Sequence, residues 1–456
     1  MKHDSEGQVE RFKGRLVAKG YSQKYEIDYD ETFSPVVRFS SIRTLLAYAV
    51  QRGMMIHQMD VVTAFLNGEL NAKIYMQQPT GYIQSGKEQL VCKLKKSLYG
   101  LKQSPRCWNG TFREYLNSIG FKESTADQCV FIRKGRYLSI IAVYVDDLIL
   151  ITETPDEMCN IKSALASRFK MKDMGQLHYC LGVSIVTEYS KIKLSQKQYI
   201  QMLLKKYRML DANPVSTPVD QKLLKNDGHS KPVNSVQYQT IVGSLLYAAM
   251  ATRPEIAHAV SVVSKFCASP TTAHMTAVKR ILVYLKGTLN LSLQYSVGDI
   301  QSQLTGYSDA DFANDETRHS TTGNVFIMSN GAISWLSKKQ TTVALSTTEA
   351  EYVALSSAAQ EAVCLRSLLD DLHIDISKPT LIYEDNQSAI AVAMSQNTVQ
   401  KRRKHIDVRH HFIQEAIQNG TICVHYCPTD HMIADILTKP LARGQFETLR
   451  TRLGLV

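Results

Sequence analysis

The 456-residue sequence contains no run of eighteen apolar residues and no Cys-x-x-Cys pair. The first absence argues against a membrane-spanning helix, which needs about twenty apolar residues to cross a bilayer. The nine cysteines are scattered, with Cys423 and Cys427 as the closest group, so we expect reduced thiols and neither a disulfide framework nor a metal site. The N-terminus, from Met1 to Gly7, lacks the apolar core of a signal peptide. These absences favour an intracellular protein.

Acidic residues are in the minority. The sequence has 53 Lys and Arg against 42 Asp and Glu, which gives a formal net charge of +11. This excess favours a polyanionic partner such as nucleic acid, although a generically basic protein would show the same balance. With 44% hydrophobic residues, the chain is long enough for about two to four domains with buried cores.

The order of predicted elements divides the chain into parts. Strands and helices alternate from Arg11 to about Leu210. A polar stretch with prolines at 211–237 predicts a linker, and apolar spacings of three and four residues predict helices over 238–289. A second α/β pattern begins near Leu304. Its predicted elements are strands near 304–309, 323–329, 332–336, 380–384 and 421–426, a helix near 348–370 and a final helix.

A pair of aspartates, Asp146 and Asp147, interrupts the apolar run from Leu138 to Ile151. The flanking β-branched and aromatic residues predict the two strands of a hairpin, with the acidic pair at its turn. The two carboxylates repel each other, and no Lys or Arg lies in the run to compensate them, so a divalent cation is favoured. An ordinary Asp-rich turn is the alternative. A third acid, Asp60, lies near the tip of another predicted strand, and three such carboxylates can hold two metal ions for nucleotidyl transfer.

Four acids in the C-terminal part occur in the order strand, helix, strand, helix. They are Asp309, Glu351, Asp385 and Asp435. Each alone would more often be a helix cap or a surface charge, but a fold that joins them can hold two Mg²⁺ ions and activate a water for attack on a phosphodiester. Asp311 competes with Asp309 for the first position and Glu349 with Glu351 for the second.

Several motifs around these acids resemble those of one family. The segments Tyr144-Val-Asp-Asp147 and Asp60-Val-x-x-Ala-Phe65 are similar to reverse transcriptase motifs. Three further segments narrow the resemblance to the Pol polyprotein of copia-type LTR retrotransposons: Arg15–Gln23, Glu31–Val36 and Ser97–Trp108. Four further segments resemble the ribonuclease H motifs of that family: Ser308–Asp311, Ser346–Glu351, Glu384–Ala389 and Ala434–Pro440.

The resemblance implies an α/β and α+β multidomain fold, with a right-hand polymerase of palm, fingers and thumb, a helical connection segment and a C-terminal ribonuclease H-like α/β domain. The implied boundaries are 1–154 for incomplete fingers and palm, 155–210 for the rest of the palm with a primer-grip hairpin and the thumb, 211–237 for the linker, 238–300 for the connection segment, and 301–456 for the ribonuclease H-like domain and tail.

The resemblance also implies a reverse transcriptase (RNA-directed DNA polymerase) with ribonuclease H activity on RNA/DNA hybrids, with two Mg²⁺ or Mn²⁺ ions in each active site. The implied catalytic metal ligands are Asp60, Asp146 and Asp147 in the polymerase and Asp309, Glu351, Asp385 and Asp435 in the ribonuclease H. The pattern Glu-Tyr-Val-Ala favours Glu351 over Glu349, and neither His425 nor His431 is assigned a role.

Further residues would contact nucleotide or nucleic acid. Phe65 would lie under the sugar of the incoming nucleotide and exclude a 2′-hydroxyl, although a buried core aromatic is the alternative. The other implied nucleotide contacts are Lys13, Arg15, Tyr99 and Gly100, and the implied nucleic-acid contacts are Leu181 and Gly182 at the primer and Arg402, Arg403 and Lys404 at hybrid phosphates. The alternative for Lys13 and Arg15 is a solvated strand face, and the alternative for Leu181 and Gly182 is a packed hairpin turn. For the basic residues 402–404 it is a solvated helix end.

The implied partners are an RNA template, a DNA primer, the RNA/DNA hybrid, deoxynucleoside triphosphates, and capsid and integrase from another polypeptide. A cytoplasmic particle and the nucleus both remain open as locations, without a membrane. The chain resembles a polyprotein fragment with the natural C-terminal end, and we expect its finger strand Arg11–Ala18 to have lost most of its partner, of which Met1–His3 would remain. The alternative function is therefore a polymerase-inactive relic that binds nucleic acid.

Overall fold

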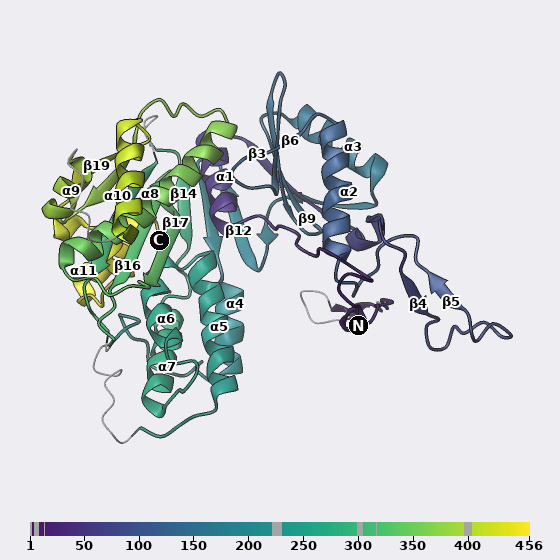
Figure 1. Ribbon diagram of the computed structural model, residues 1–456, viewed down its shortest axis with the longest axis horizontal. Coiled ribbons are helices and arrows are strands. Elements are labelled where there is room, and N and C mark those ends of the chain that lie inside the picture. The colour runs from purple at the N-terminus through teal and green to yellow at the C-terminus, as the bar shows by residue number, and fades with distance from the viewer. Residues whose placement is uncertain are drawn as a thin grey trace. The chain divides into compact units, whose positions relative to one another are not determined.

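The computed structural model describes residues 2–3, 9–12, 14–220, 230–298, 304–315, 317–395 and 404–456 (Figure 1). The chain forms two compact units. The first unit consists of Met1–Val37 and Met55–Gln176, and the second of Arg38–Met54 and Leu177–Val456. Within the described ranges, no helix combines the length and the apolar character needed to cross a membrane. The five-part division implied by the family resemblance remains a prediction.

The first unit contains a six-stranded antiparallel sheet with the strand order β10-β3-β9-β8-β7-β6. Its strands are β3 (Met55–Val61), β6 (Lys122–Glu123), β7 (Val130–Lys134), β8 (Leu138–Tyr144), β9 (Asp147–Thr152) and β10 (Met171–Gln176). Two helices, α2 (Ser104–Ser118) and α3 (Pro155–Arg168), cover one face of this sheet (Figure 1). Trp108, Phe112 and Leu165 from these helices pack on Leu148 and Leu150 of β9 in one buried cluster. The predicted hairpin of apolar strands is therefore the centre of the unit.

Shorter strands complete the first unit. These are β1 (Lys2–His3) paired with β2 (Val9–Arg11), and β4 (Tyr75–Gln77) paired with β5 (Val91–Lys93). The predicted hairpin is present in part, because Lys2 of β1 pairs with Arg11 of β2. The expected strand from Arg11 to Ala18 was wrong beyond Arg11, because residues 12 and 14–18 belong to no strand. This segment instead crosses closely over a loop. The Ala18 amide donates to the Tyr99 carbonyl at 2.7 Å, and a Cβ added to Gly20 would lie 1.9 Å from the Gly100 oxygen.

The second unit holds a four-stranded antiparallel sheet in the order β11-β12-β13-β14, together with a group of helices. The strands are β11 (Tyr179–Cys180), β12 (Val183–Glu188), β13 (Lys191–Ser195) and β14 (Leu293–Ser296), and the helices are α4 (Lys197–Lys206), α5 (Ser235–Ala251), α6 (Ala257–Ser264) and α7 (Thr272–Gly287). The expected helical periodicity over 238–289 is confirmed as α5, α6 and α7. The short strand β14 was not predicted.

A five-stranded mixed sheet in the order β17-β16-β15-β18-β19 forms the rest of the second unit. Its strands are β15 (Thr305–Asp311), β16 (Thr321–Met328), β17 (Gly331–Lys339), β18 (Thr380–Glu384) and β19 (Ile422–Tyr426), and its helices are α8 (Thr347–Asp371), α9 (Gln387–Met394), α10 (Lys404–Gln418) and α11 (Arg443–Arg452). The pairs β15–β18 and β18–β19 are parallel and the others antiparallel. The predicted α/β pattern of this part is confirmed.

Helix α1 (Phe39–Gln51) belongs to the second unit, although it precedes most of the first unit in the chain. Ten consecutive residues of this helix, from Ser41 to Val50, are buried. The Arg43 guanidinium lies 3.8 Å over the Trp335 ring of β17 and donates to the Met250 carbonyl of α5 at 2.6 Å. Burial lowers the pKa of Arg43 to about 10, so the side chain stays charged at neutral pH. The helix is thus part of this unit's core.

Candidate active sites

Two acids of the first constellation face each other across a strand pair. Asp60 of β3 is paired with Asp147, the first residue of β9, and side chains of directly opposite residues lie on one face of a sheet. Gln58 donates a hydrogen bond to Asp147 Oδ1 at 3.1 Å. Burial raises the pKa of Asp147, and the nearby charges of Asp146 and Asp60 raise it further. The three predicted carboxylates are therefore electrostatic neighbours.

The turn between β8 and β9 differs from the expected one. Its two residues are Val145 and Asp146, whereas Asp147 already belongs to β9. Val145 has a φ of 59°, a left-handed conformation that is costly for a β-branched residue. Two hydrogen bonds hold the strained turn: Trp108 Nε1 donates to the Val145 carbonyl at 2.6 Å, and the Val61 amide donates to the Asp146 carbonyl at 2.9 Å. The acidic pair is thereby fixed at the end of the sheet.

Four residues with a predicted nucleotide contact lie close together near this turn. The Phe65 ring is 5.0 Å from the Tyr99 ring, and the Arg15 guanidinium lies 4.9 Å over Tyr99. Gly100 has a φ of 94°, and a Cβ there would lie 2.1 Å from the Ala18 oxygen, so the close crossing requires glycine. Burial raises the pKa of Tyr99 and the charges of Asp146 and Asp60 add to the effect. Lys13 lies outside the described residues.

The second constellation converges at one edge of the five-stranded sheet. Oxygens of Asp309, Glu351 and Asp385 all lie within 4.8 Å of one another. Parallel pairing of β15 with β18 brings Asp309 and Asp385 to the same edge, and Glu351 lies in the second turn of α8. Small side chains let α8 approach β15 closely, because Ala310, Ala350 and Ala354 form the contact. Among the described residues this is the one such set of ligand atoms, so the acids of the first unit lie less close together.

Burial sets the electrostatics of this cluster. It raises the pKa of Glu351 to about 11, with Asp309 and Glu384 adding to the shift, and raises the pKa of Asp435 to about 7. Glu351 Oε2 is buried without a hydrogen-bond partner. Carboxylate oxygens are the ligands that Mg²⁺ prefers, and a cation would relieve both the repulsion and the unpaired oxygen. These residues therefore fit a divalent metal ion.

Asp435 lies in a 3₁₀ helix, Ile433–Leu437, where we predicted a helix without specifying its type. Its Oδ1 atom forms an ion pair with Lys439 Nζ at 2.9 Å, and the same ammonium is 3.7 Å from Asp309 Oδ1. Thr438 Oγ1 donates to the other oxygen of Asp309. Sequence reasoning missed Thr438, Lys439 and the fully buried Glu384. A lysine four residues after a buried acid was the available signal for Lys439.

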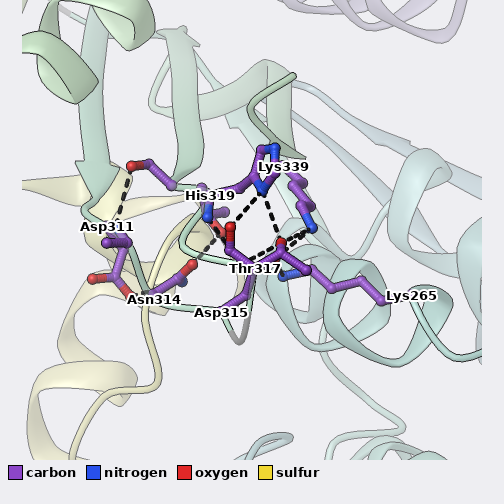
Figure 2. Close-up of polar contacts among 10 residues, drawn as sticks. Lys265, Asp311, Asn314, Asp315, Thr317, His319 and Lys339 are labelled. Atoms are coloured by element: carbon purple, nitrogen blue, oxygen red, sulfur yellow. Dashed lines mark hydrogen bonds and ion pairs between the residues drawn. The ribbon is translucent and has the colours of Figure 1, made fainter. Parts of the chain in front are cut away.

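The structure favours Asp309 over Asp311 and Glu351 over Glu349. Glu349 accepts from the Leu345 amide at 2.9 Å and its own amide donates to Ser346 Oγ, which makes it a cap of α8. Asp311 lies outside the 4.8 Å set and accepts from Asn314 Nδ2 at 2.8 Å (Figure 2). Both assignments to the active site nevertheless remain proposals.

The loop between β15 and β16 is organised by Asp315 (Figure 2). The carboxylate of Asp315 forms an ion pair with Lys339 Nζ at 2.6 Å and accepts hydrogen bonds from Thr317 Oγ1 at 2.8 Å and from the His319 amide at 2.9 Å, and Lys265 Nζ lies 3.7 Å away. Although burial acts to raise it, these hydrogen bonds hold the pKa of Asp315 well below its usual range. The loop that follows the first catalytic candidate is thus tied to α6 and β17.

Replacing Asp315 with Asn should destabilise the second unit by about 2 kcal/mol at pH 7, because Lys339 loses a charged acceptor. A carboxyl with a depressed pKa stabilises the fold above its ordinary pKa and loses this contribution as pH falls through the folded value. The difference between wild type and Asp315→Asn should therefore shrink at acid pH. Denaturant unfolding at pH 7 and pH 3 measures both, with the exposed Asp211→Asn as control. An equal difference at both pH values would contradict the role.

The predicted nucleic-acid contacts are only partly described. Leu181 and Gly182 form the turn of the β11–β12 hairpin with φ values of 49° and 76°. Tyr247 Oη donates to the Leu181 carbonyl, and a Cβ on Gly182 would lie 2.4 Å from that hydroxyl oxygen. The packed turn predicted as an alternative is thus present. Arg402 and Arg403 lie outside the described residues, and Lys404 begins α10 with its side chain outside them.

Residues 1–221 match the family model described as reverse transcriptase (RNA-dependent DNA polymerase). The chain is 42% identical over 468 residues to a retrovirus-related Pol polyprotein from transposon TNT 1-94 of Nicotiana tabacum, covering 100% of this chain and 35% of the relative. It is 42% identical over 458 residues to that from transposon RE1 of Arabidopsis thaliana, covering 100% and 31%. A putative transposon Ty5-1 protein of Saccharomyces cerevisiae is 34% identical over 308 residues, covering 66% of this chain and 100% of the relative.

This chain therefore spans about a third of the length of the first two relatives. Among solved structures, LC11-RNase H1 isolated from compost is 16% identical with a TM-score of 0.24, covering 30% of this chain and 94% of that one. Prototype foamy virus protease-reverse transcriptase is 13% identical with a TM-score of 0.21, covering 91% and 49%. Structural similarities with TM-scores this low do not identify any residue of the two sites described above.

Proposed function

The chain belongs to the copia-type family of retrovirus-related Pol polyproteins, and from that premise we propose that its first unit copies an RNA template into DNA and its second unit cleaves the RNA strand of RNA/DNA hybrids. A DNA primer and deoxynucleoside triphosphates would be the further substrates of the first unit.

One observation carries the polymerase proposal: Asp60 and Asp147 face each other across the β3–β9 ladder, beside Asp146 in a strained turn. Val145 holds a left-handed backbone in this turn, and residues held in such strained conformations cluster at functional sites. The aromatic pair of Phe65 and Tyr99 adjoins these acids, and the stacked Arg15 supplies a positive charge suited to a triphosphate. Acids, an aromatic wall and a cation together fit nucleotide binding.

For the ribonuclease H proposal, the carrying observation is the buried set of Asp309, Glu351 and Asp385 with oxygens within 4.8 Å. Glu349 and Asp311, the competing acids, have other hydrogen-bond partners that explain them. Glu384 lies buried beside the set and increases its negative potential.

Two Mg²⁺ or Mn²⁺ ions per site would be held by Asp60, Asp146 and Asp147 in the first unit and by Asp309, Glu351, Asp385 and Asp435 in the second. Such ions, when bound, lower the pKa of an attacking hydroxyl or water and stabilise charge on the leaving group. The protein's own groups orient the ligands. Gln58 holds one oxygen of Asp147, and Thr438 holds one oxygen of Asp309.

Extension of oligo(dT) on a poly(rA) template in Mg²⁺ and then Mn²⁺ tests the first activity, and release of fragments from a labelled RNA/DNA hybrid tests the second. Extension by the purified protein would support a working polymerase. Binding of hybrid without extension in either metal would overturn the polymerase proposal and favour the nucleic-acid-binding relic.

Phe65→Val should relax the choice of sugar. A smaller side chain leaves space for a 2′-hydroxyl, so the preference for deoxynucleotides over ribonucleotides should fall by about 10- to 100-fold, the range expected when a pocket gains one small group of space. Single-nucleotide incorporation of dTTP and UTP measures the ratio. The exposed aromatic variant Tyr82→Ala is the control and should keep the wild-type ratio. An unchanged ratio in Phe65→Val would place Phe65 in the core only.

A further inference from the structure

We propose that Lys439 is a built-in competitor of one metal ion in the ribonuclease H site: its ammonium group lies between Asp309 and Asp435, where an ion bridging these two acids would bind, and must move aside when that ion arrives. This inference rests on the proposed hybrid-cleaving function and goes beyond it, because it makes the two ion positions unequal.

The first argument is geometric. Lys439 Nζ is 2.9 Å from Asp435 Oδ1 and 3.7 Å from Asp309 Oδ1, so one cation contacts both carboxylates at once. The two acidic side chains are only 1% and 2% exposed, whereas the lysine side chain is 31% exposed. A long flexible lysine with one end open to solvent can leave this position, but the buried acids cannot follow it. The ammonium therefore acts as an exchangeable occupant.

The second argument is the asymmetry of the cluster. Asp309 also contributes to the set with Glu351 and Asp385. Asp385 accepts from Thr429 Oγ1 at 2.8 Å, and in the described part of the chain neither Asp385 nor Glu351 has a Lys or Arg within ion-pair distance. An ion bound by this set meets three acids, of which Asp309 alone lies within ion-pair distance of Lys439. An ion between Asp309 and Asp435 has to displace Lys439.

The third argument is what the lysine does while no metal is bound. Buried carboxylates without a compensating cation destabilise a fold strongly. Lys439 supplies a positive charge to two of them at the place where they repel each other. Lys439 thus stabilises the folded arrangement of Asp309 and Asp435 before the metal binds. The same contact weakens the binding of a metal ion to these two acids.

Two substitutions of Lys439 in the full chain test this. Lys439→Met removes the charge and keeps much of the side-chain bulk, whereas Lys439→Arg keeps the charge. Magnesium binding is measured by isothermal titration calorimetry, and thermal unfolding is recorded in EDTA and across the same Mg²⁺ range. We expect Lys439→Met to unfold at a lower temperature in EDTA and to bind the weaker of the two Mg²⁺ ions of the ribonuclease H site at least about tenfold more tightly than wild type.

Lys439→Arg should bind this ion no more tightly than wild type does. Lys338→Met, a control at an exposed lysine of β17, should leave both quantities unchanged. Equal or weaker binding of the second ion in Lys439→Met would overturn the inference while leaving the proposed function intact. Absence of Mg²⁺ binding at this cluster in wild type and variants alike would overturn the proposed ribonuclease H function and the inference with it.

A measurement on the wild-type chain covers the case in which Lys439→Met fails to fold. Acetylation of lysines by an N-hydroxysuccinimide ester, read by peptide mass spectrometry, reports how accessible each amine is. Lys439 should react slowly in EDTA and several-fold faster in saturating Mg²⁺, whereas Lys338 should react equally in both. A Lys439 reactivity that is unchanged or lower in Mg²⁺ would overturn the displacement.

Discussion

Asp147→Asn should lower DNA synthesis by about 10³-fold or more while hybrid cleavage by the second unit changes less than twofold. Asn has nearly the same shape and can still accept the hydrogen bond from Gln58, so the strand pairing with Asp60 should persist. The substitution removes the negative charge that a cation at this position requires. Primer extension on poly(rA)/oligo(dT) measures the loss, and the hybrid-cleavage assay on the same preparation verifies folding.

The matched control is Asp173→Asn in the neighbouring strand β10. Asp173 is half exposed, pairs with Lys162 at 2.8 Å and stands opposite Met59 in the β10–β3 ladder, so its loss should change extension by less than about threefold. A variant Asp147→Asn that extends primers at the wild-type rate would refute the assignment of this acid. Equal losses in both variants would indicate damage to the fold instead.

Glu351→Gln should abolish hybrid cleavage and, in EDTA, make the protein more stable than wild type by about 1–4 kcal/mol at pH 8. Burial and Asp309 raise the pKa of Glu351 to about 11, so the folded state retains a proton that the unfolded state releases above the ordinary value. Stability of the metal-free protein therefore falls as pH rises from about 5 to 8. Asp435, with its pKa raised to about 7, contributes in the lower part of this range.

Thermal unfolding in EDTA from pH 5 to pH 8 measures how steeply stability falls with rising pH. This fall should be shallower in Glu351→Gln than in wild type. Added Mg²⁺ should restore wild-type stability at pH 8 and have a smaller effect on the variant. The control is Glu349→Gln, two residues earlier in α8, which should retain cleavage and lose a little stability because Glu349 caps the helix. A wild-type slope that rises with pH in EDTA would contradict the raised pKa values.

Much of the second site could be predicted, because each acid lies in or directly after a recognisable element. Asp309 was expected to end its strand but lies two residues before the end of β15, Asp385 follows β18 and Glu351 lies early in α8, so parallel pairing of the strands alone brings two of them together. Lys439 could not be predicted in the same way. Its position between Asp309 and Asp435 depends on the 3₁₀ helix that precedes it, and the sequence of a lysine is the same whether the side chain faces solvent or a buried carboxylate.

The errors in the first unit have physical reasons as well. Alternation of charged and apolar residues predicted a strand to Ala18. The Ala18 amide instead donates its hydrogen bond to the carbonyl of Tyr99, which lies in a loop and not in a neighbouring strand. The turn at Val145 was assigned to the two aspartates because Asp tolerates left-handed backbone better than Val. Tertiary hydrogen bonds from Trp108 and Val61 overrode that preference.

Helix α1 has a consequence for how the protein is made. The ribosome completes α1 at Gln51, but its partner strand β17 begins at Gly331, about 280 residues later. At about 5–20 residues per second, the helix waits roughly a quarter of a minute to a minute before that strand emerges. During this interval the six-stranded sheet of Met55–Gln176 is synthesised and can fold, while the apolar residues of Ser41–Val50 have no finished core to enter. The buried apolar side chains of α1 therefore lack their β17 partner during this interval, and a recombinant fragment that starts after Gln176 lacks a core helix of its own fold.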